Sequence, residues 1–346
     1  MNILFLEGDM SRAGGTEKMT VWLANELSKK FNVHIISLHF SKDKVFFPLL
    51  NSVNHTILKN GNMLNQIFQI HHYIKQHKID RVINVDTGMG IFGVLAALFT
   101  KARVITWEHS NFHNNWNSRI FPYLRKFAAK FSNKMVVLSE KDKQNYLLNI
   151  HHCKDVTVIP NPMSEYGGAY DINCKTILSA GLLCEIKRFD RIIPIAKEVF
   201  AKHPDWSWII CGDGDERANL EKLISENNLN GKVILAGTVT NIAKFYKNSA
   251  MFVLTSQTEG LPMVLLEAKA HKLPIVSFDI QTGPSDIIRD NQNGFLVEPY
   301  NIEEMAEKIN LLIENEDLRI QFSNNTILDI EKFSQERIIE QWINLL

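Results

Sequence analysis

Two glutamates, Glu259 and Glu267, bracket the part of this chain whose residue types are best suited to chemistry. An apolar run at 251–254 and two small polar residues precede Glu259, and Pro262 follows it closely. This order predicts a buried parallel strand, a turn and a helix that begins near Pro262, because proline is tolerated in a first helical turn. The first N–H groups of that helix, together with its dipole, can bind an anion. The residues of this turn are Gly260, Leu261, Pro262, Met263 and Val264.

Two acceptor carboxylates around an anion site suit a molecule with a phosphate at one point and hydroxyl groups on both sides, such as a nucleotide sugar. The same pattern also fits an ordinary helix with two solvated or capping glutamates. The run K-L-P-I-V-S-F at 272–278 predicts another buried strand directly after the helix. The helix would then begin at the carboxyl ends of a parallel sheet, where open α/β sheets bind ligands, and this context favours a binding site.

Adjacent cations at Lys187 and Arg188 follow a predicted strand that ends near Gly181. Two cations at that place could neutralise a diphosphate leaving group, whose negative charge grows in the transition state. The alternative is a solvated turn. The nearest Asp-x-Asp pair, Asp213 and Asp215, lies in a predicted turn and not at the end of a strand, so we expect no catalytic metal and no cofactor.

An early glycine pair, Gly14 and Gly15, precedes a helix predicted from about Thr16 to Lys30. The pair lets backbone N–H groups approach a phosphate or a sugar, although it is also compatible with a bare turn. The dinucleotide fingerprint G-x-G-x-x-G is absent, which disfavours a Rossmann dehydrogenase. His109 follows the strand predicted at 103–107, and so it is expected at the carboxyl edge of a sheet.

A length of 346 residues is sufficient for two domains, and 45% apolar and 22% charged residues are ordinary globular values. The four cysteines form no paired framework, and Met1 leads straight into a predicted strand, so we expect a cytoplasmic protein without a signal peptide. No apolar run reaches the roughly 18 residues that a membrane span needs.

Charge is divided unevenly along the chain. Residues 1–163 contain 20 lysines and arginines against 11 aspartates and glutamates, whereas residues 164–346 contain 18 against 27. The segment 119–134 is a predicted basic helix that also carries aromatic residues, and its cations are Arg119, Arg125, Lys126, Lys130 and Lys134. This composition favours peripheral contact with an anionic membrane, although burial of the aromatic side chains against the sheet would explain the pattern equally.

Strands alternate with helices in both halves, which predicts an α/β protein with a parallel sheet in each half. The prolines of 159–162 and the pair Gly167-Gly168 predict a linker between them.

The spacing E-x7-E, from Glu259 to Glu267, resembles the signature of the retaining family-4 glycosyltransferases. Further motifs similar to those of that family follow in its order along nearly the whole chain. They are the Gly-Gly loop at Gly14–Glu17, E-H-S-N at Glu108–Asn111, V-I-P-N-P at Val158–Pro162, Lys187 with Arg188, C-G-D-G at Cys211–Gly214, G-F-L-V at Gly294–Val297, and Phe333, Ser334, Glu336 and Trp342.

The resemblance implies the GT-B fold, in which two facing Rossmann-like α/β domains with parallel sheets enclose an interdomain cleft. It implies an acceptor-side domain at 1–163, a nucleotide-sugar-binding domain at 164–333 and a final helix at 334–346 that crosses back to the first domain.

The resemblance also implies roles for single residues. Glu259 and His109 would contact the donor sugar, Lys187 with Arg188 the diphosphate, and Glu267 the ribose. The implied catalytic residues are His109, Lys187, Arg188 and Glu259. The implied donor-binding residues are Gly14, Gly15, Gly212, Gly237, Gly260, Leu261, Pro262, Met263, Val264 and Glu267. The loop from Gly237 to Asn241 is expected to form the edge that binds the nucleotide base.

The implied activity is metal-independent, retaining transfer of a hexose or N-acetylhexosamine from a UDP-sugar to a glycan or lipid-linked glycan acceptor. The segment Thr282–Ile288 resembles the branch that builds bacterial capsule, exopolysaccharide or lipopolysaccharide. Nucleic acid is not an expected partner. One departure concerns Leu182, which stands where the family pattern has arginine, and Arg188 is the residue that could compensate. Two other functions stay open: a GT-B-fold nucleotide-sugar epimerase, and a nucleotide-sugar-binding protein without catalysis.

Overall fold

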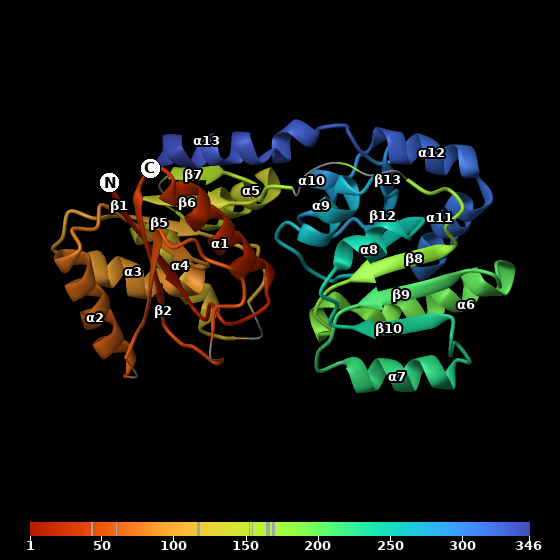
Figure 1. Cartoon of the computed structure of the whole chain (residues 1–346), viewed down its shortest axis with the longest axis horizontal. Helices are drawn as coiled ribbons and strands as arrows, with labels where there is room; N and C mark the ends of the chain where they lie inside the picture. Colours follow the sequence, from red (N-terminus) through yellow and green to blue (C-terminus); the bar gives the residue numbers. More distant parts are fainter. Residues whose placement is uncertain are drawn as a thin grey trace. The chain divides into compact units, whose positions relative to one another are not determined.

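The computed structural model describes residues 1–42, 44–59, 61–115, 118–151, 153, 155–163, 167 and 170–346. These residues divide into two units, Met1–Asn161 with Glu336–Leu346, and Pro162–Gln335, which are coloured along the chain in Figure 1. Ser164, the predicted start of the second domain, and Gly168 of the predicted linker lie outside the described residues.

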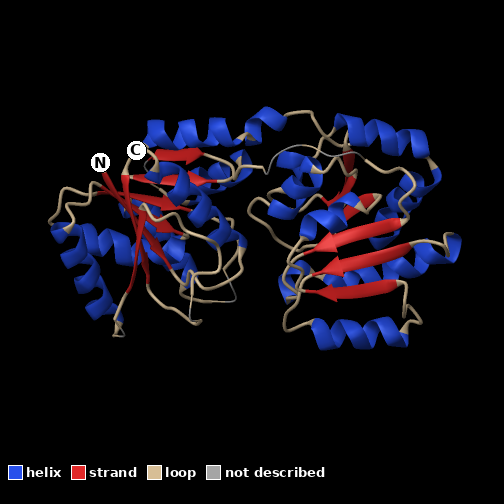
Figure 2. Cartoon of the chain, viewed as in Figure 1, coloured by secondary structure: helices blue, strands red, loops and turns tan. Residues whose placement is uncertain are grey.

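The first unit is built on a sheet of seven parallel strands in the order β3-β2-β1-β4-β5-β6-β7. Its strands are β1 (Asn2–Glu7), β2 (Asn32–Ser37), β3 (Val53–Ile57), β4 (Arg81–Val85), β5 (Arg103–Trp107), β6 (Lys134–Val137) and β7 (Asp155–Val158). Its helices are α1 (Gly15–Ser28), α2 (Met63–Gln76), α3 (Gly90–Ala97), α4 (Phe121–Phe131), α5 (Glu140–Asn149) and α13 (Gln335–Leu345), with a 3₁₀ turn at Thr87–Met89. The central strand β1 is apolar at 3–6 because helices cover both faces of the sheet (Figure 2).

The second unit is built on six parallel strands in the order β10-β9-β8-β11-β12-β13. They are β8 (Thr176–Ala180), β9 (Ser207–Cys211), β10 (Val233–Gly237), β11 (Met251–Leu254), β12 (Ile275–Phe278) and β13 (Gly294–Val297). The helices are α6 (Ile192–Lys202), α7 (Arg217–Glu226), α8 (Ile242–Lys247), α9 (Met263–Ala270), α10 (Pro284–Ile287), α11 (Ile302–Glu314) and α12 (Glu316–Asn325). Three 3₁₀ turns lie at Glu185–Lys187, Phe189–Arg191 and Ile330–Phe333.

Both sheets reverse their strand order at one place, between β1 and β4 in the first unit and between β8 and β11 in the second. In open α/β sheets ligands bind outside the carboxyl ends of the strands at this switch point. The structure confirms the predicted fold class, which is α/β with a Rossmann-like parallel sheet in each unit.

The last helix, α13, belongs to the first unit although it follows the second unit in the chain. Its buried side chains are Ile338 and Trp342, and the Trp342 ring meets the Trp107 ring edge-on at 5.0 Å between centroids. No helix of the described part of the chain has the length and apolar character of a membrane span.

Several elements differ from the predicted ones. The apolar run at 91–99 predicts a helix, but α3 ends at Ala97, and Phe99 is 95% exposed with a positive φ of 60°. The edge strand β3 and the helix α5 have no counterpart in the sequence analysis, because V-N-H-T-I and E-K-D-K-Q-N-Y-L-L-N carry weak apolar periodicity.

Candidate functional site

An ion pair occupies the switch point of the second sheet. Lys187 follows β8 and Glu259 follows β11, and Lys187 Nζ lies 2.6 Å from Glu259 Oε1. The two side chains are 24% and 10% exposed, so the pair is partly shielded from water. The two loops are also joined directly, since Thr255 Oγ1 donates to the Lys187 carbonyl and the Gln257 N–H donates to the Ile186 carbonyl. The structure therefore brings two of the predicted catalytic residues together on a fixed backbone.

The helix α9 presents an amino end without a side-chain cap. Its N-cap is Pro262, which has extended backbone, no N–H group and no capping side chain. The first N–H groups of a helix have no acceptor within the helix, and here they belong to Met263 and Val264. Both residues are half-buried, whereas Leu261 is buried beneath them. The turn after Gly260 therefore offers backbone donors and a dipole to an anion, as predicted.

A second segment, Thr282 and Gly283, packs against this turn. Thr282 Oγ1 donates to the Glu259 carbonyl at 2.5 Å. Gly283 has a φ of +100°, and a Cβ at that position would lie 2.6 Å from Pro262 Cδ and 3.0 Å from the Gly260 carbonyl oxygen. The segment Thr282–Ile288 was expected only to mark the polysaccharide branch, and its contact with the turn after Glu259 was not predicted. The dipeptide Gly283-Pro284 after a buried strand was the available signal, because such a dipeptide marks a constrained turn.

Glycine turns close the ends of β8, β9 and β10. Gly212 has a φ of +140°, donates to the Gly237 carbonyl at 2.9 Å, and would place a Cβ only 1.8 Å from the Gly181 carbonyl oxygen. A side chain is therefore excluded where these backbones meet. A pocket of about 560 Å³ begins at the loop that follows Gly237. Its walls include the loop Thr238–Asn241, residues of α8, Ile209 of β9 and Thr176, the first residue of β8.

Arg188 lies beside the ion pair but is engaged elsewhere. Its backbone is left-handed, with φ 50° and ψ 44°. Its guanidinium donates to both carboxylate oxygens of Asp190, at 2.9 and 2.8 Å, and these bonds raise the pKa of Arg188. Leu182, at the position of the family arginine, is 60% exposed. Recruitment of Arg188 by a diphosphate would require exchange from Asp190.

His109 lies at the carboxyl end of β5 in the first unit. Its ring contacts the ring of Trp107, with 4.0 Å between centroids. Burial lowers the pKa of His109 to about 3, so the imidazole is neutral at physiological pH. Its Nε2 is buried, and within the described residues it has no hydrogen-bond partner. A buried polar atom of this kind is costly unless a ligand or water satisfies it.

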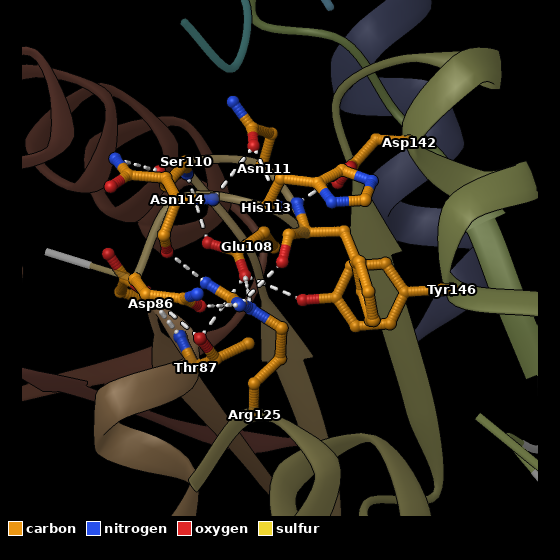
Figure 3. A network of polar contacts seen from close by, with 12 residues as sticks. Asp86, Thr87, Glu108, Ser110, Asn111, His113, Asn114, Arg125, Asp142 and Tyr146 are labelled. Carbon is orange, nitrogen blue, oxygen red and sulfur yellow. Dashed lines mark hydrogen bonds and ion pairs between the residues drawn. The ribbon is translucent and has the colours of Figure 1, made fainter. Parts of the chain in front are cut away.

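Glu108, next to His109, is the centre of a buried polar network (Figure 3). The Tyr146 hydroxyl and Thr87 Oγ1 donate to Glu108 Oε2 at 2.6 and 3.1 Å, and the Ser110 N–H donates to Oε1 at 3.0 Å. Arg125 reaches into the same network, with Nε 3.6 Å from Glu108 Oε2.

The position of Arg125 corrects one prediction. Arg125 was predicted to be one of the cations with which the segment 119–134 contacts a membrane, but it is only 2% exposed. Its guanidinium donates to the carbonyls of Phe112 and Asn114 and to Asn115 Oδ1. The repeat of cations along the sequence could not reveal that one of them faces a buried carboxylate.

Further buried carboxyl groups surround Glu108. Burial and the neighbouring Glu108 raise the pKa of Asp142 to about 7 and raise that of Asp86 well above its usual range. Burial and Glu17 raise the pKa of Glu7, at the end of β1, to about 7. The helix α1 begins at Gly15, with Gly14 as its N-cap, so the predicted glycine loop lies beside Glu7 and Glu17. Sequence reasoning missed this cluster, because each acid follows a different strand.

No group of three or more histidine, cysteine, aspartate or glutamate side chains suited to a metal ion occurs among the described residues.

Comparison with known proteins places this chain in a family. The family described as Glycosyltransferase Family 4 matches residues 13–164, and the family described as Glycosyl transferases group 1 matches residues 171–329. An uncharacterized glycosyltransferase of Haemophilus influenzae is 30% identical over 98% of both chains. The amylovoran biosynthesis glycosyltransferase AmsD of Erwinia amylovora is 29% identical over 99% of both chains.

Among solved structures, a TarM variant from S. aureus in complex with fondaparinux, alpha-GlcNAc-glycerol and UDP is similar at 28% identity and a TM-score of 0.72. The match covers 81% of this chain and 58% of TarM, so this chain spans less than two thirds of that protein. The two family matches and the full-length relative agree with the predicted resemblance. The chain belongs to the glycosyltransferases that combine a family-4 half with a group 1 half and have the GT-B fold.

Proposed function

We propose that this glycosyltransferase transfers a hexose or N-acetylhexosamine from a UDP-sugar to a glycan acceptor in bacterial surface polysaccharide synthesis, with retention of the anomeric configuration. The observation that carries this proposal is the arrangement at β8 and β11. The ion pair of Lys187 and Glu259 lies at the switch point of the second sheet. The helix α9 follows Glu259, has no side-chain cap at its amino end and carries Glu267.

Each part of a nucleotide sugar has a suitable partner in this arrangement. The N–H groups of Met263 and Val264 and the Lys187 ammonium are donors for the diphosphate. Glu267 accepts hydrogen bonds from the ribose hydroxyls and Glu259 from hydroxyls of the sugar. The loop after Gly237 provides backbone groups beside a cavity for the base.

The first unit has the chemistry of an acceptor side. A neutral imidazole with a buried, unpartnered Nε2 suits a sugar hydroxyl, and so do the carboxyl groups beside Gly14 and Gly15. The raised pKa values of Glu7 and Glu17 favour their neutral forms, which repel a diphosphate less than carboxylates do. Neutral carboxyl groups still provide no positive charge to bind a diphosphate. We therefore assign the phosphates to the second unit, and acceptor hydroxyls to the glycine loop of the first. This proposal departs from the sequence-based expectation that Gly14 and Gly15 bind the donor.

Transfer in this arrangement needs no protein nucleophile. The bond between the anomeric carbon and the diphosphate oxygen breaks while the acceptor oxygen bonds to the same face of that carbon. The departing phosphate oxygen takes the proton of the acceptor hydroxyl. Lys187 and the start of α9 stabilise the charge that grows on the leaving group, which is a task that a metal ion has in other transferases.

The names of two similar proteins support the substrate classes. AmsD is named for amylovoran biosynthesis, and a TarM variant was solved in complex with UDP and alpha-GlcNAc-glycerol.

A donor panel tests this function. Thermal shifts with UDP-glucose, UDP-galactose, UDP-GlcNAc, UDP-GalNAc and GDP-mannose identify the donor, and mass analysis with NMR of the anomeric proton identifies the product. We expect UDP release and an α-linked product. A β-linked product would contradict retention, sugar altered without acceptor would indicate an epimerase, and binding without consumption would indicate a non-catalytic protein.

We also propose that α4 contacts an anionic membrane, where a lipid-linked acceptor would lie. With Arg125 buried and Lys134 paired to Asp155 at 2.9 Å, the exposed cations of this segment are Arg119, Lys126 and Lys130. The exposed apolar side chains beside them are those of Ile120, Tyr123 and Phe131, at 65, 73 and 53%.

Sedimentation with anionic vesicles tests the contact. Near-surface cations contribute about 1 kcal/mol each, so Lys126→Glu with Lys130→Glu should weaken binding at least about tenfold at low salt. The matched control is Lys202→Glu with Lys222→Glu, on exposed positions of the second unit. Equal binding by both double variants, or no binding by the unmodified protein, would reject the contact.

A further inference from the structure

Glu267 is held by one buried tyrosine of the neighbouring helix. Tyr246 of α8 is 0% exposed, and its hydroxyl donates to Glu267 Oε2 at 3.0 Å. The same hydroxyl lies 3.3 Å from the Val264 carbonyl oxygen, one turn earlier on α9. The labels α8 and α9 in Figure 1 mark the two helices.

The tyrosine ring is itself fixed by its neighbours. It stacks on the His271 ring with 5.0 Å between centroids and an interplanar angle of 18°, and on the Phe252 ring at 5.8 Å and 28°. His271 Nδ1 in turn contacts the Glu267 carbonyl oxygen at 2.8 Å. The hydroxyl of Tyr246 therefore has little freedom to leave the carboxylate.

Burial and the Glu267 carboxylate raise the pKa of Tyr246 well above its usual range, so the hydroxyl stays a donor at physiological pH. A carboxylate has about four lone-pair sites. The hydrogen bond from Tyr246 restricts rotation of the carboxylate, and a carboxylate can accept from several donors at once. Preorganisation of this kind increases affinity because the ordering cost is not incurred at binding.

We propose that Tyr246 is a positioning residue that orients the Glu267 carboxylate toward the 2′- and 3′-hydroxyls of the donor ribose. The inference rests on the proposed function, since it requires Glu267 to bind ribose. It adds a link between two parts of the donor site. Tyr246 lies on α8, the helix that directly follows the loop Thr238–Asn241, so the helix after the base-side loop also carries the partner of the ribose carboxylate.

The test uses calorimetry on the full chain with UDP and with 2′,3′-dideoxy-UDP. The variants are Tyr246→Phe, which keeps the ring, Glu267→Ala, and both together. A hydrogen bond to a charged group changes an equilibrium by about tenfold to a hundredfold. We expect Glu267→Ala to weaken UDP binding within that range, and Tyr246→Phe to weaken it by about fivefold to twentyfold. Tyr246→Phe should change dideoxy-UDP binding by less than about twofold, and it should add little in the Glu267→Ala background.

Tyr170→Phe is the matched control, because its hydroxyl donates to the Ala250 carbonyl at 2.7 Å elsewhere in the same unit. That variant should bind UDP like the unmodified protein. If Tyr246→Phe weakens both nucleotides equally, or still weakens UDP binding when Glu267 is absent, its effect is general packing and the inference is wrong.

The ribose contact of Glu267 and the positioning role of Tyr246 are tested separately by these variants. Unchanged UDP affinity in Glu267→Ala would overturn the ribose assignment and this inference with it. A weakened Glu267→Ala together with an unaffected Tyr246→Phe would overturn only the positioning role. If Tyr246→Phe unfolds below the assay temperature, the comparison of the two nucleotides is made at a lower temperature at which this variant is folded.

Discussion

The carboxyl edges of the two sheets have the same kind of switch point but treat charge in opposite ways. At β8 and β11, Lys187 and Glu259 pair across the edge and an uncapped helix start lies beside them. At β1, β4 and β5, the acids Glu7, Asp86 and Glu108 are packed together, and Arg125 is the cation that contacts Glu108. This contrast is the basis for the proposal that the second edge binds the diphosphate and the first edge binds uncharged hydroxyl groups.

This difference shows that a Rossmann-like sheet positions a site without determining what it binds. The residues directly after each strand make that choice. In the second unit, the turn of Gly260 and Pro262 leaves the first N–H groups of α9 without a side-chain cap. In the first unit, the buried carboxylate of Glu108 accepts hydrogen bonds from the side chains around it. Substitutions at either edge should therefore affect different properties, namely turnover at the second edge and the pH dependence of stability at the first.

Removal of Lys187 should have the largest effect. In Lys187→Ala the leaving diphosphate loses a fixed cation in a partly shielded site, and one such donor can contribute about 2.7–4 kcal/mol, or about a hundredfold to a thousandfold in turnover. Steady-state rates with the identified donor measure this loss. Lys222→Ala, on the exposed surface of α7, is the control, and equal rates for both variants would show that the second edge does not bind the diphosphate.

Removal of Arg188 should have an intermediate effect on turnover. If a diphosphate draws its guanidinium away from Asp190, Arg188→Ala should lower turnover at least about tenfold, because a planar fork binds two phosphate oxygens. Leu182→Arg should then restore part of the rate. Kinetics of both single variants and the double variant decide, and an unchanged rate in Arg188→Ala would end the idea that Arg188 replaces the family arginine.

The buried acids of the first edge predict a pH dependence of stability. The pKa values of Asp142 and Glu7 are about 7 in the folded chain and ordinary when it is unfolded, so the folded state binds more protons between about pH 4 and 7. The contribution of these two groups to the free energy of unfolding should therefore be largest below about pH 4. As the pH rises to about 7, each group should lower the free energy of unfolding by at most about 1.4 kcal/mol per pH unit.

Asp142→Asn should remove part of that fall while it keeps the acceptor for the Phe112 N–H. Hydrogen exchange of α5 at pH 5 and 7.5 measures the change, and Glu140→Gln on the exposed side of the same helix is the control. A pH profile that is the same in Asp142→Asn and in the unmodified chain would contradict the account of the first edge.

Metal removal should have the smallest effect. Because Lys187 and the start of α9 are assigned the charge of the leaving group, activity should be within about twofold of its original value after treatment with EDTA. Activity assays before and after chelation measure this. Loss with EDTA and rescue by magnesium or manganese would show that a bound cation shares that task.

Local sequence patterns predicted the fold well where the signal was continuous. Buried strands such as β1 and β11 are apolar runs, and the start of α9 at Pro262 follows from backbone chemistry. Edge elements such as β3 were missed because half of their residues face water. The turn that carries Glu259 and the helix that carries Glu267 were predicted, because both residues belong to one local segment, and their roles at the donor stay a prediction.

The remaining site features depend on contacts between distant segments. Arg125 could not be placed beside Glu108 from its sequence neighbours, and the Asp86–Glu108–Asp142 cluster joins β4, β5 and α5. The same holds for Tyr246 and Glu267, which are 21 residues apart. Helical periodicity assigns such side chains to a buried face, but tertiary packing decides which partner they meet.

A crystal structure of the full chain with UDP tests the central claim most directly. We predict that the diphosphate lies against the N–H groups of Met263 and Val264 and within reach of Lys187, with the ribose hydroxyls on Glu267. A diphosphate bound instead beside Gly14 and Gly15, at the acidic edge of the first sheet, would contradict the assignment of the two edges.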